Sequence, residues 1–172
     1  MQRHRPYACS YQKRPLLRDR LDINEVILEV IEFTHGEAVK NGVSAKLELA
    51  DGLPLVQGDR VHLQQVILNL IINAVDAMSS VNEGPRELLI SSSKAESGVL
   101  VMVRDSGPAV APGALERAFD AFHTTKPSGL GLGLSICREI IEALGGRLWA
   151  SPNETRGATF QFIAPGWTVK SS

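Results

Sequence analysis

Three short polar segments interrupt the apolar pattern of this chain in a fixed order, and they restrict its fold more than any other feature. They are Asn69-Leu-Ile-Ile-Asn73, Asp105-Ser-Gly107 and Gly129-Leu-Gly131-Leu-Gly133. At about 3.6 residues per turn, Asn69 and Asn73 lie one above the other on the same face of a helix. The fold must therefore bring a helix face, a strand end and a glycine-rich loop together, where they can form the walls of one pocket.

The composition indicates a single compact domain and excludes several classes of partner. The chain has 172 residues, of which 44% are hydrophobic, which suffices for one sizeable core. Eighteen basic residues against 19 acidic ones give a pI near 6.4, so charge gives no reason to expect nucleic acid or an anionic membrane as a partner. No uninterrupted apolar run has the length of a membrane span, so we expect no membrane contact.

The two cysteines, Cys9 and Cys137, lack any CxxC or Cys/His spacing. Neither a disulfide framework nor a zinc site is therefore indicated, and a reducing, cytoplasmic setting is expected. Cys137 falls on the apolar side of a predicted helix and is expected in the core. We interpret the basic residues 1–21 as a linker or leader with little order, residues 22–166 as the domain, and residues 167–172 as a tail.

In the first half of the domain, the hydrophobic spacing predicts two long helices. Asp22 and Glu25 match a capping box before a helix that should end at Asn41-Gly42. Residues 43–49 alternate as a half-buried strand, and a short extended piece follows at 55–57. Asp59 can cap a second helix over about 60–80, whose predicted core-facing residues include Val61, Val66, Leu70 and Ala74.

In the second half, strands are predicted at 87–94 and 99–104, joined by a tight turn. Residues 108–126 have the composition of a mobile connection with a short helix at 113–118, and are a candidate lid. A helix at 132–144 and strands near 147–150 and 158–163 complete the pattern. The order predicts an α/β two-layer sandwich, with a mixed sheet of about five strands and three main helices on one face.

The asparagine pair suits a metal-phosphate group. Mg²⁺ prefers oxygen ligands and keeps several waters, so the Asn73 carbonyl together with nucleotide phosphates can hold it. Asn69 could orient a phosphate or a metal-bound water, but an amide is not a general base. Gln65, one turn earlier, could reach a phosphate or simply lie on an exposed helix face. The alternative is that both asparagines cap contacts between helices or face solvent.

Asp105, at the end of a predicted strand, can accept a hydrogen bond from an exocyclic amino group, and Gly107 lets the backbone approach a ring. Adenine carries that amino group, whereas guanine has a carbonyl there. Taken alone, the Asp-Ser-Gly-Pro segment also fits an ordinary turn.

The alternating glycines precede a helix, so their backbone N–H groups can face phosphates near its positive end. The segment lacks the GK[ST] ending of a P-loop and the GxGxxG spacing of a dinucleotide fold. Lys126, just before it, can neutralise phosphate charge, or it can be a solvated loop lysine.

Because it contains the asparagine pair, Asp105 and the alternating glycines in this order, the chain resembles the ATP-binding catalytic domain of bacterial sensor histidine kinases over roughly residues 22–165. That domain has the Bergerat fold of the GHKL superfamily, which also includes gyrase, Hsp90 and MutL ATPases. The matching motifs are the N box at 69–74, the first glycine box at 105–107, the F box at 119–126, the second glycine box at 129–133 and the third at 157–159. Ala109 and His123 depart from the usual pattern.

The resemblance implies Mg²⁺ chelation by Asn73, adenine recognition by Asp105, and transfer of the ATP γ-phosphoryl group to a histidine. Asn69, Asn73 and Lys126 would be catalytic. Nucleotide contacts are further implied for Gln65, Gly107 and Thr159, and for the loop residues Gly129, Leu130, Gly131, Leu132 and Gly133. We expect the phosphoacceptor histidine on a dimerisation domain outside this chain, because residues before Asp22 are too few and too proline-rich for its helical hairpin. A response regulator would be the downstream partner.

Two other classes of function compete with this interpretation. A non-catalytic regulator would use ATP only to change lid order and partner affinity. An autonomous ATPase, or a serine kinase of the anti-sigma type, would be expected to carry a carboxylate where this chain has Asn69.

Overall fold

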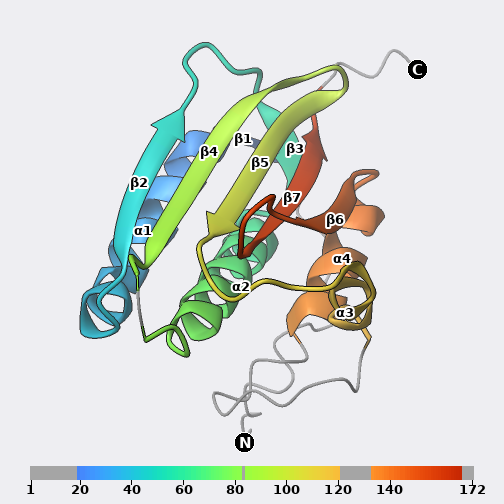
Figure 1. Cartoon of the computed structure of the whole chain (residues 1–172). Helices are drawn as coiled ribbons and strands as arrows, with labels where there is room; N and C mark the ends of the chain where they lie inside the picture. The colour runs from blue at the N-terminus through green and yellow to red at the C-terminus, as the bar shows by residue number, and fades with distance from the viewer. Residues whose placement is uncertain (1–18, 83, 121–132, 168–172) are drawn as a thin grey trace, which may run out of the picture.

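The domain consists of a sheet covered by helices on one face, as the computed structural model shows for residues 19–82, 84–120 and 133–167 (Figure 1). The structure confirms the predicted α/β two-layer sandwich. The elements follow in the order β1 (Asp19–Leu21), α1 (Ile23–Lys40), β2 (Ser44–Leu49), β3 (Val56–Gly58), α2 (Arg60–Met78), β4 (Glu87–Ala95), β5 (Gly98–Asp105), α3 (Pro112–Arg117), α4 (Gly133–Ala143), β6 (Arg147–Pro152) and β7 (Ala158–Pro165).

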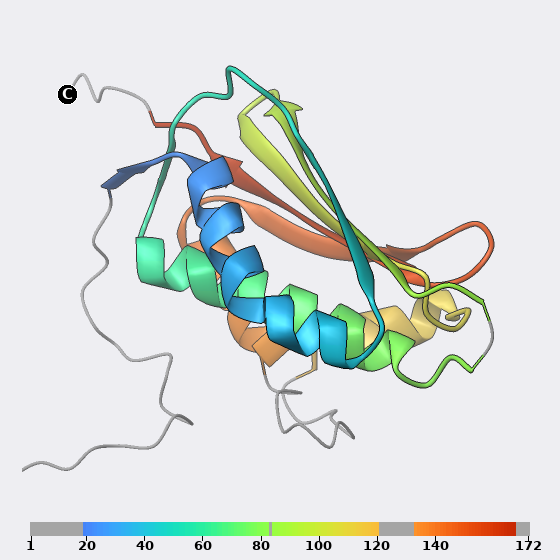
Figure 2. The same ribbon diagram turned by 90° about the vertical axis from the view of Figure 1, so that its left-hand side faces the viewer.

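The main sheet has five strands in the order β2-β4-β5-β7-β6. Only β2 and β4 are parallel, and all other neighbours in this sheet are antiparallel, so the sheet is mixed as predicted. A parallel pair requires a crossover connection, and here the chain between β2 and β4 contains β3 and the long helix α2. This crossover places α2 under the middle of the sheet, where the turned view in Figure 2 also shows it.

The core lies between the sheet and the helices. Inward side chains follow the alternation of the central strands, with Val99, Val101 and Val103 on β5 and Phe160 and Phe162 on β7, all 3% exposed or less. Helix α2 is buried on two sides because it packs against both α1 and α4. By composition α2 could cross a membrane, but 56% of its apolar window is buried inside the domain, which is typical of a core helix.

Charged side chains fasten the ends of the two long helices. The Arg60 guanidinium at the start of α2 hydrogen-bonds to Glu29 of α1 and lies 3.4 Å from Glu25, and the bond from Arg60 lowers the pKa of Glu29. Arg86 donates to the carbonyls of Asn41, after α1, and of Val81, after α2, at 2.7 Å each. The start of β4 is therefore tied to the C-terminal ends of both helices, where carbonyl groups lack helical partners.

Several details differ from the sequence expectations. Asp22 caps α1 as predicted, but its side chain accepts from the Asn24 N–H, and the Glu25 carboxylate faces Arg60 instead of completing a capping box. Strand β2 exists, yet it was wrongly predicted to be half-buried, because it is the edge strand and five of its six residues are exposed. Val61 was wrongly placed in the core: it is 55% exposed in the first turn of α2.

The small second sheet was not predicted as a sheet, although its strand β3 coincides with the short extended piece expected at 55–57, and β1 was not predicted. It pairs β1 with β3 in antiparallel register, with Leu21 opposite Val56. Leu21 is 5% exposed, so this strand contributes to the core although it lies within the segment whose composition indicated a linker. A three-residue strand is too short for the alternation pattern to reveal.

Leu70 gives a direct test of the core. It lies on α2 with no exposed area, so Leu70→Ala leaves a cavity between α2 and its neighbours, and we expect the free energy of unfolding to fall by about 2–5 kcal/mol. Leu28→Ala is the matched control, because Leu28 is 48% exposed on α1 and its loss should cost about 0.5 kcal/mol or less. Urea unfolding followed by circular dichroism measures both, and equal effects would contradict the assigned packing.

Candidate functional site

Asp105 lies at an inward-facing position of β5, at the end of the strand. It continues the series of core residues Val99, Val101 and Val103, and it is only 4% exposed. Its cross-strand partner on β4 is Leu88, which is also buried. The strand alternation therefore directs this carboxylate toward the helices and away from the open face of the sheet.

Backbone groups hold the Asp105 carboxylate in place. Its Oδ1 accepts from the N–H of Gly107 at 2.8 Å and from the N–H of Ala158 at 3.3 Å. These bonds fix the orientation of the group. A carboxylate offers about four acceptor positions, so such a group can accept from a ligand amino group as well as from backbone N–H groups.

Two glycines close around Asp105. A Cβ on Gly157, whose φ is +86°, would lie 2.1 Å from the Asp105 carbonyl oxygen. A Cβ on Gly107 would lie 3.0 Å from Oδ1 of Asp105 and 3.3 Å from Ala77 of α2. The first and third glycine boxes therefore meet at this carboxylate, and Gly107 joins it to the C-terminal half of α2.

Asn69 is enclosed by α4. It is 8% exposed, and its Nδ2 lies 3.6 Å from the Cys137 Sγ. A Cβ on Gly133, the first residue of α4, would lie 2.7 Å from the same nitrogen. The end of the glycine-rich loop thus packs directly on the N box, as expected for two walls of one pocket.

Cys137 is a core residue, as predicted. It has no exposed area, and burial raises the pKa of its thiol to about 12. The thiol therefore stays protonated, and it serves as a packing and hydrogen-bonding partner for Asn69.

Asn73 lies one turn beyond Asn69 on α2 and is half-buried. Among the residues that the structure describes, none forms a hydrogen bond with its side-chain amide. No group of three or more His, Cys, Asp or Glu side chains with metal-binding geometry occurs in the described ranges. A cation at this site would therefore take few protein ligands, which is how Mg²⁺ is commonly held beside nucleotide phosphates.

Gln65 is half-buried one turn before Asn69 on the same helix, so it lies along the same row as the asparagines. Lys126 and the loop residues Gly129, Leu130, Gly131 and Leu132, together with His123, lie outside the described residues. Just before that segment, Phe119 is 6% exposed and packs on Phe160 of β7, with ring centroids 5.8 Å apart. The Arg138 guanidinium of α4 lies 3.9 Å from the centroid of the Phe119 ring.

Thr159 does not join the other predicted site residues. It pairs with Arg104 across β5 and β7, so its side chain points to the open face of the sheet, opposite to the Asp105 carboxylate. There its hydroxyl donates to Oδ1 of Asn153 at 2.5 Å. The register thus corrects the expectation that Thr159 shares the pocket with Asp105, and the inward neighbour on β7 is Ala158.

Asn153 was missed in the sequence. Its Nδ2 donates to the carbonyl oxygens of Asp105, at 2.8 Å, and of Arg156, at 3.0 Å, so it locks the β6–β7 turn onto the end of β5. A single Asn in a polar turn gives no sequence signal that would distinguish it from an ordinary turn residue.

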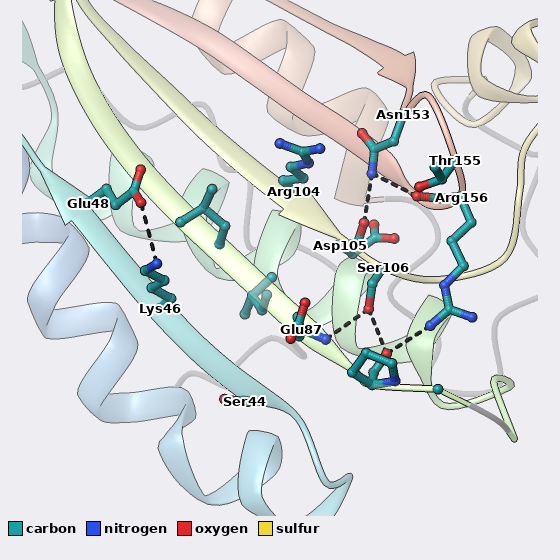
Figure 3. Close-up of a pocket in the computed structure, with 14 residues that line it drawn as sticks. Ser44, Lys46, Glu48, Glu87, Arg104, Asp105, Ser106, Asn153, Thr155 and Arg156 are labelled. Atoms are coloured by element: carbon teal, nitrogen blue, oxygen red, sulfur yellow. Dashed lines mark hydrogen bonds and ion pairs between the residues drawn. The ribbon is translucent and has the colours of Figure 1, made fainter.

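A hollow of about 610 Å³ lies on the open face of the sheet (Figure 3). Lys46, Leu89 and Arg104 line it from the strands, and Asn153 and Arg156 form one side. It shares Asp105 with the candidate site, but the carboxylate is directed to the other side of the sheet. This hollow therefore lies on the opposite face of the sheet from the candidate nucleotide site at α2, the start of α4 and the end of β5.

Comparisons with known proteins agree with this geometry. Residues 58–167 match the family of histidine kinase-, DNA gyrase B- and HSP90-like ATPases. The sensor protein TdiS of Thauera aromatica is 36% identical over 167 residues, which cover 96% of this chain and 30% of TdiS. The chain thus spans under a third of that relative.

Solved structures show the same relationship. The catalytic domain of the histidine kinase ThkA is 34% identical, with a TM-score of 0.77, covering 87% of this chain and 96% of that domain. A structure of ThkA in complex with the response regulator protein TrrA is 31% identical, with a TM-score of 0.77, covering 93% of this chain and 45% of the ThkA chain.

The chain belongs to this ATPase family. Within the family it is an ATP-binding catalytic domain of the sensor histidine kinase type, since the ThkA catalytic domain is matched over nearly its whole length.

Gly157 tests the tight packing around Asp105. Gly157→Ala combines strain at a positive φ with a clash on the Asp105 carbonyl, so we expect a larger loss of unfolding free energy than for Gly42→Ala. Gly42 has a φ of +67° with open space around its Cα, and its substitution should cost only the backbone strain of about 1–2 kcal/mol. Thermal unfolding of both variants measures the difference. Equal losses of unfolding free energy in the two variants would contradict the tight packing of Gly157 against the Asp105 carbonyl.

Proposed function

We propose that this domain binds Mg-ATP and transfers the γ-phosphoryl group to a histidine on a separate phosphoacceptor and dimerisation domain. The observation that carries the proposal is the buried Asp105 carboxylate, held by two backbone N–H groups beside the asparagine row of α2. A fixed, buried acceptor at a strand end suits the amino group of adenine. The neighbouring amides suit the phosphate end of the same ligand.

The roles of the site residues follow from their chemistry. Asp105 accepts from the exocyclic amino group, and Gly107 lets the backbone approach the purine ring. Asn69 and Gly133 hold the N box against the start of α4, where backbone N–H groups can face phosphates. We assign to Lys126 the neutralisation of phosphate charge during transfer.

Asn73 fits the role of magnesium ligand, because its amide oxygen is a hard donor and no described residue engages the side chain. When bound there, Mg²⁺ would neutralise charge on the phosphate oxygens. Imidazole is its own nucleophile, so the domain needs no general base. This agrees with an amide at Asn69, which cannot take up a proton from water.

The partners follow from the same interpretation. The phosphoacceptor domain belongs to the same full-length protein or acts in trans, and a response regulator receives the phosphoryl group. TrrA in complex with ThkA supports that last assignment. We place the reaction in the cytoplasm, where ATP and reduced cysteines occur together. The non-catalytic regulator is not favoured, because Asn73 and Lys126 are both present.

Asn73→Ala removes the proposed metal ligand without disturbing the core. We expect the affinity for a non-hydrolysable ATP analogue to fall at least about tenfold in the presence of Mg²⁺, and the gain in affinity from Mg²⁺ to disappear. Calorimetric titration with and without Mg²⁺ measures both. Gln64→Ala is the control, since Gln64 lies on the α1 side of the same helix and donates to Glu29. An unchanged magnesium dependence in the Asn73 variant would remove the assignment.

Asp105→Asn tests adenine recognition. The amide can still accept from the Gly107 and Ala158 N–H groups through its oxygen, but its NH₂ group then meets the amino group of adenine, donor against donor. We expect ATP binding to weaken by about 1.5–3 kcal/mol and the preference for ATP over GTP to shrink. Competition titrations measure the preference. A retained preference in a folded variant would contradict the role of Asp105.

A further inference from the structure

The outer edge of β2 is open among the described residues. Strand β2 is the first in the five-stranded sheet, and within these residues it pairs with β4 alone (Figures 1 and 2). Unpaired edges of this length usually carry a feature that prevents pairing or one that directs it.

The backbone direction of β2 follows from its bonds to β4. The N–H groups of Ser44 and Ala50 donate to carbonyls of Arg86 and Ser92 at 2.9 and 3.2 Å, so even-numbered residues point inward along the sheet. Successive backbone groups in a strand alternate in direction. The N–H and C=O groups of Ala45, Leu47 and Leu49 therefore face outward, away from β4.

The side chains of β2 divide into a charged face and an apolar face. Lys46 and Glu48 lie on the open face of the sheet, with Nζ and Oε2 3.8 Å apart (Figure 3). Leu47 lies on the helix side and is 36% exposed. The edge is therefore a short strand with opposite charges on one face and an exposed leucine on the other.

The flank of α1 next to this edge also carries exposed apolar side chains. Asn24 on that flank donates to the Ala50 carbonyl at 2.8 Å, which locates it beside the end of β2. Leu28, one turn further, and Val39, three turns beyond Leu28, fall on the same flank and are 48% and 62% exposed. Glu32 and His35 lie between them on this flank and are exposed too, so the helix side of the edge carries two exposed apolar residues separated by polar ones.

We propose that β2 pairs antiparallel with β2 of a second copy of this chain, around a two-fold axis at Leu47. In this register the outward backbone groups of Leu47 meet those of the partner's Leu47, and Ala45 meets Leu49. Lys46 lies opposite Glu48 in both directions, so each charge has an oppositely charged cross-strand neighbour. The interface is isologous, as a two-fold dimer requires.

Charge selects this register over its neighbours. Because the outward backbone groups belong to odd-numbered residues, the adjacent antiparallel registers are centred on Lys46 or on Glu48. These place Lys46 opposite Lys46, or Glu48 opposite Glu48, and like charges directly opposite are destabilising. The opposite charges of Lys46 and Glu48 thus disfavour both slipped registers and favour the register centred on Leu47.

The pairing leaves the nucleotide site uncovered. β4 separates β2 from β5, where Asp105 lies, and Asn69 and Asn73 are on α2. ATP binding is therefore an independent measurement of correct folding in every variant below, and a failure of the proposed kinase function would not alter the outcome for dimerisation.

Two single charge changes and their mixture test the proposal. Sedimentation of the whole chain over a roughly hundredfold concentration range should show a shift from 18.6 kDa to twice that mass.

Lys46→Glu and Glu48→Lys should each weaken dimerisation at least about tenfold, because like charges then face each other. An equimolar mixture of the two variants should form a heterodimer, since one strand then carries two carboxylates and the other two ammonium groups at the facing positions. The double variant K46E/E48K should dimerise by itself, because the exchange of the two charges restores opposite neighbours.

Three results would overturn the proposal. The first is a chain that remains monomeric into the millimolar range. The second is a dimer that both single variants form as well as the original chain, which would place the interface elsewhere. The third is a mixture of variants that fails to associate while both still bind ATP, which would exclude the register centred on Leu47.

Discussion

The burial of one carboxylate organises the site. Asp105 occupies a core position of β5, where an uncompensated charge would be costly. Backbone N–H groups of Gly107 and Ala158 donate to Oδ1 and supply this compensation. The Asn153 amide donates to the main-chain carbonyl of Asp105 and holds the end of the strand. The glycines allow this close approach. The ends of β5 and β7 and the β6–β7 turn are arranged around that requirement.

Helix α2 joins the core to the site. Its apolar residues pack between α1 and α4, while Asn69 interrupts the apolar pattern where α2 meets α4, and Asn73 follows one turn later. Asn69 is held by the Cys137 thiol and by the first residue of α4, where only a glycine fits. The same helix therefore contributes apolar residues to the core and both asparagines to the candidate site. The packing of α2 in the core thus fixes where the asparagines lie.

The two faces and the edges of the sheet have different roles. The helix side carries the core and the nucleotide site, while the open side carries a polar hollow and the Lys46–Glu48 pair. One strand, β4, separates the edge strand β2 from β5, whose last residue is Asp105. A catalytic domain can thus associate through the β2 edge without blocking its nucleotide site, because β4 lies between that edge and the end of β5.

The sequence by itself determined the order of the helices and of the main-sheet strands, the cap residues of α1 and α2, the layer architecture and the motif set of the site, because periodicity and local hydrogen bonding decide these features within a few residues. Tertiary structure decided the rest. The exposure of β2 depends on strand order, the direction of Thr159 depends on its register with Arg104, and Asn153 matters only because the β6–β7 turn meets Asp105. These are contacts between segments distant along the chain, and no local pattern encodes which segments will be neighbours.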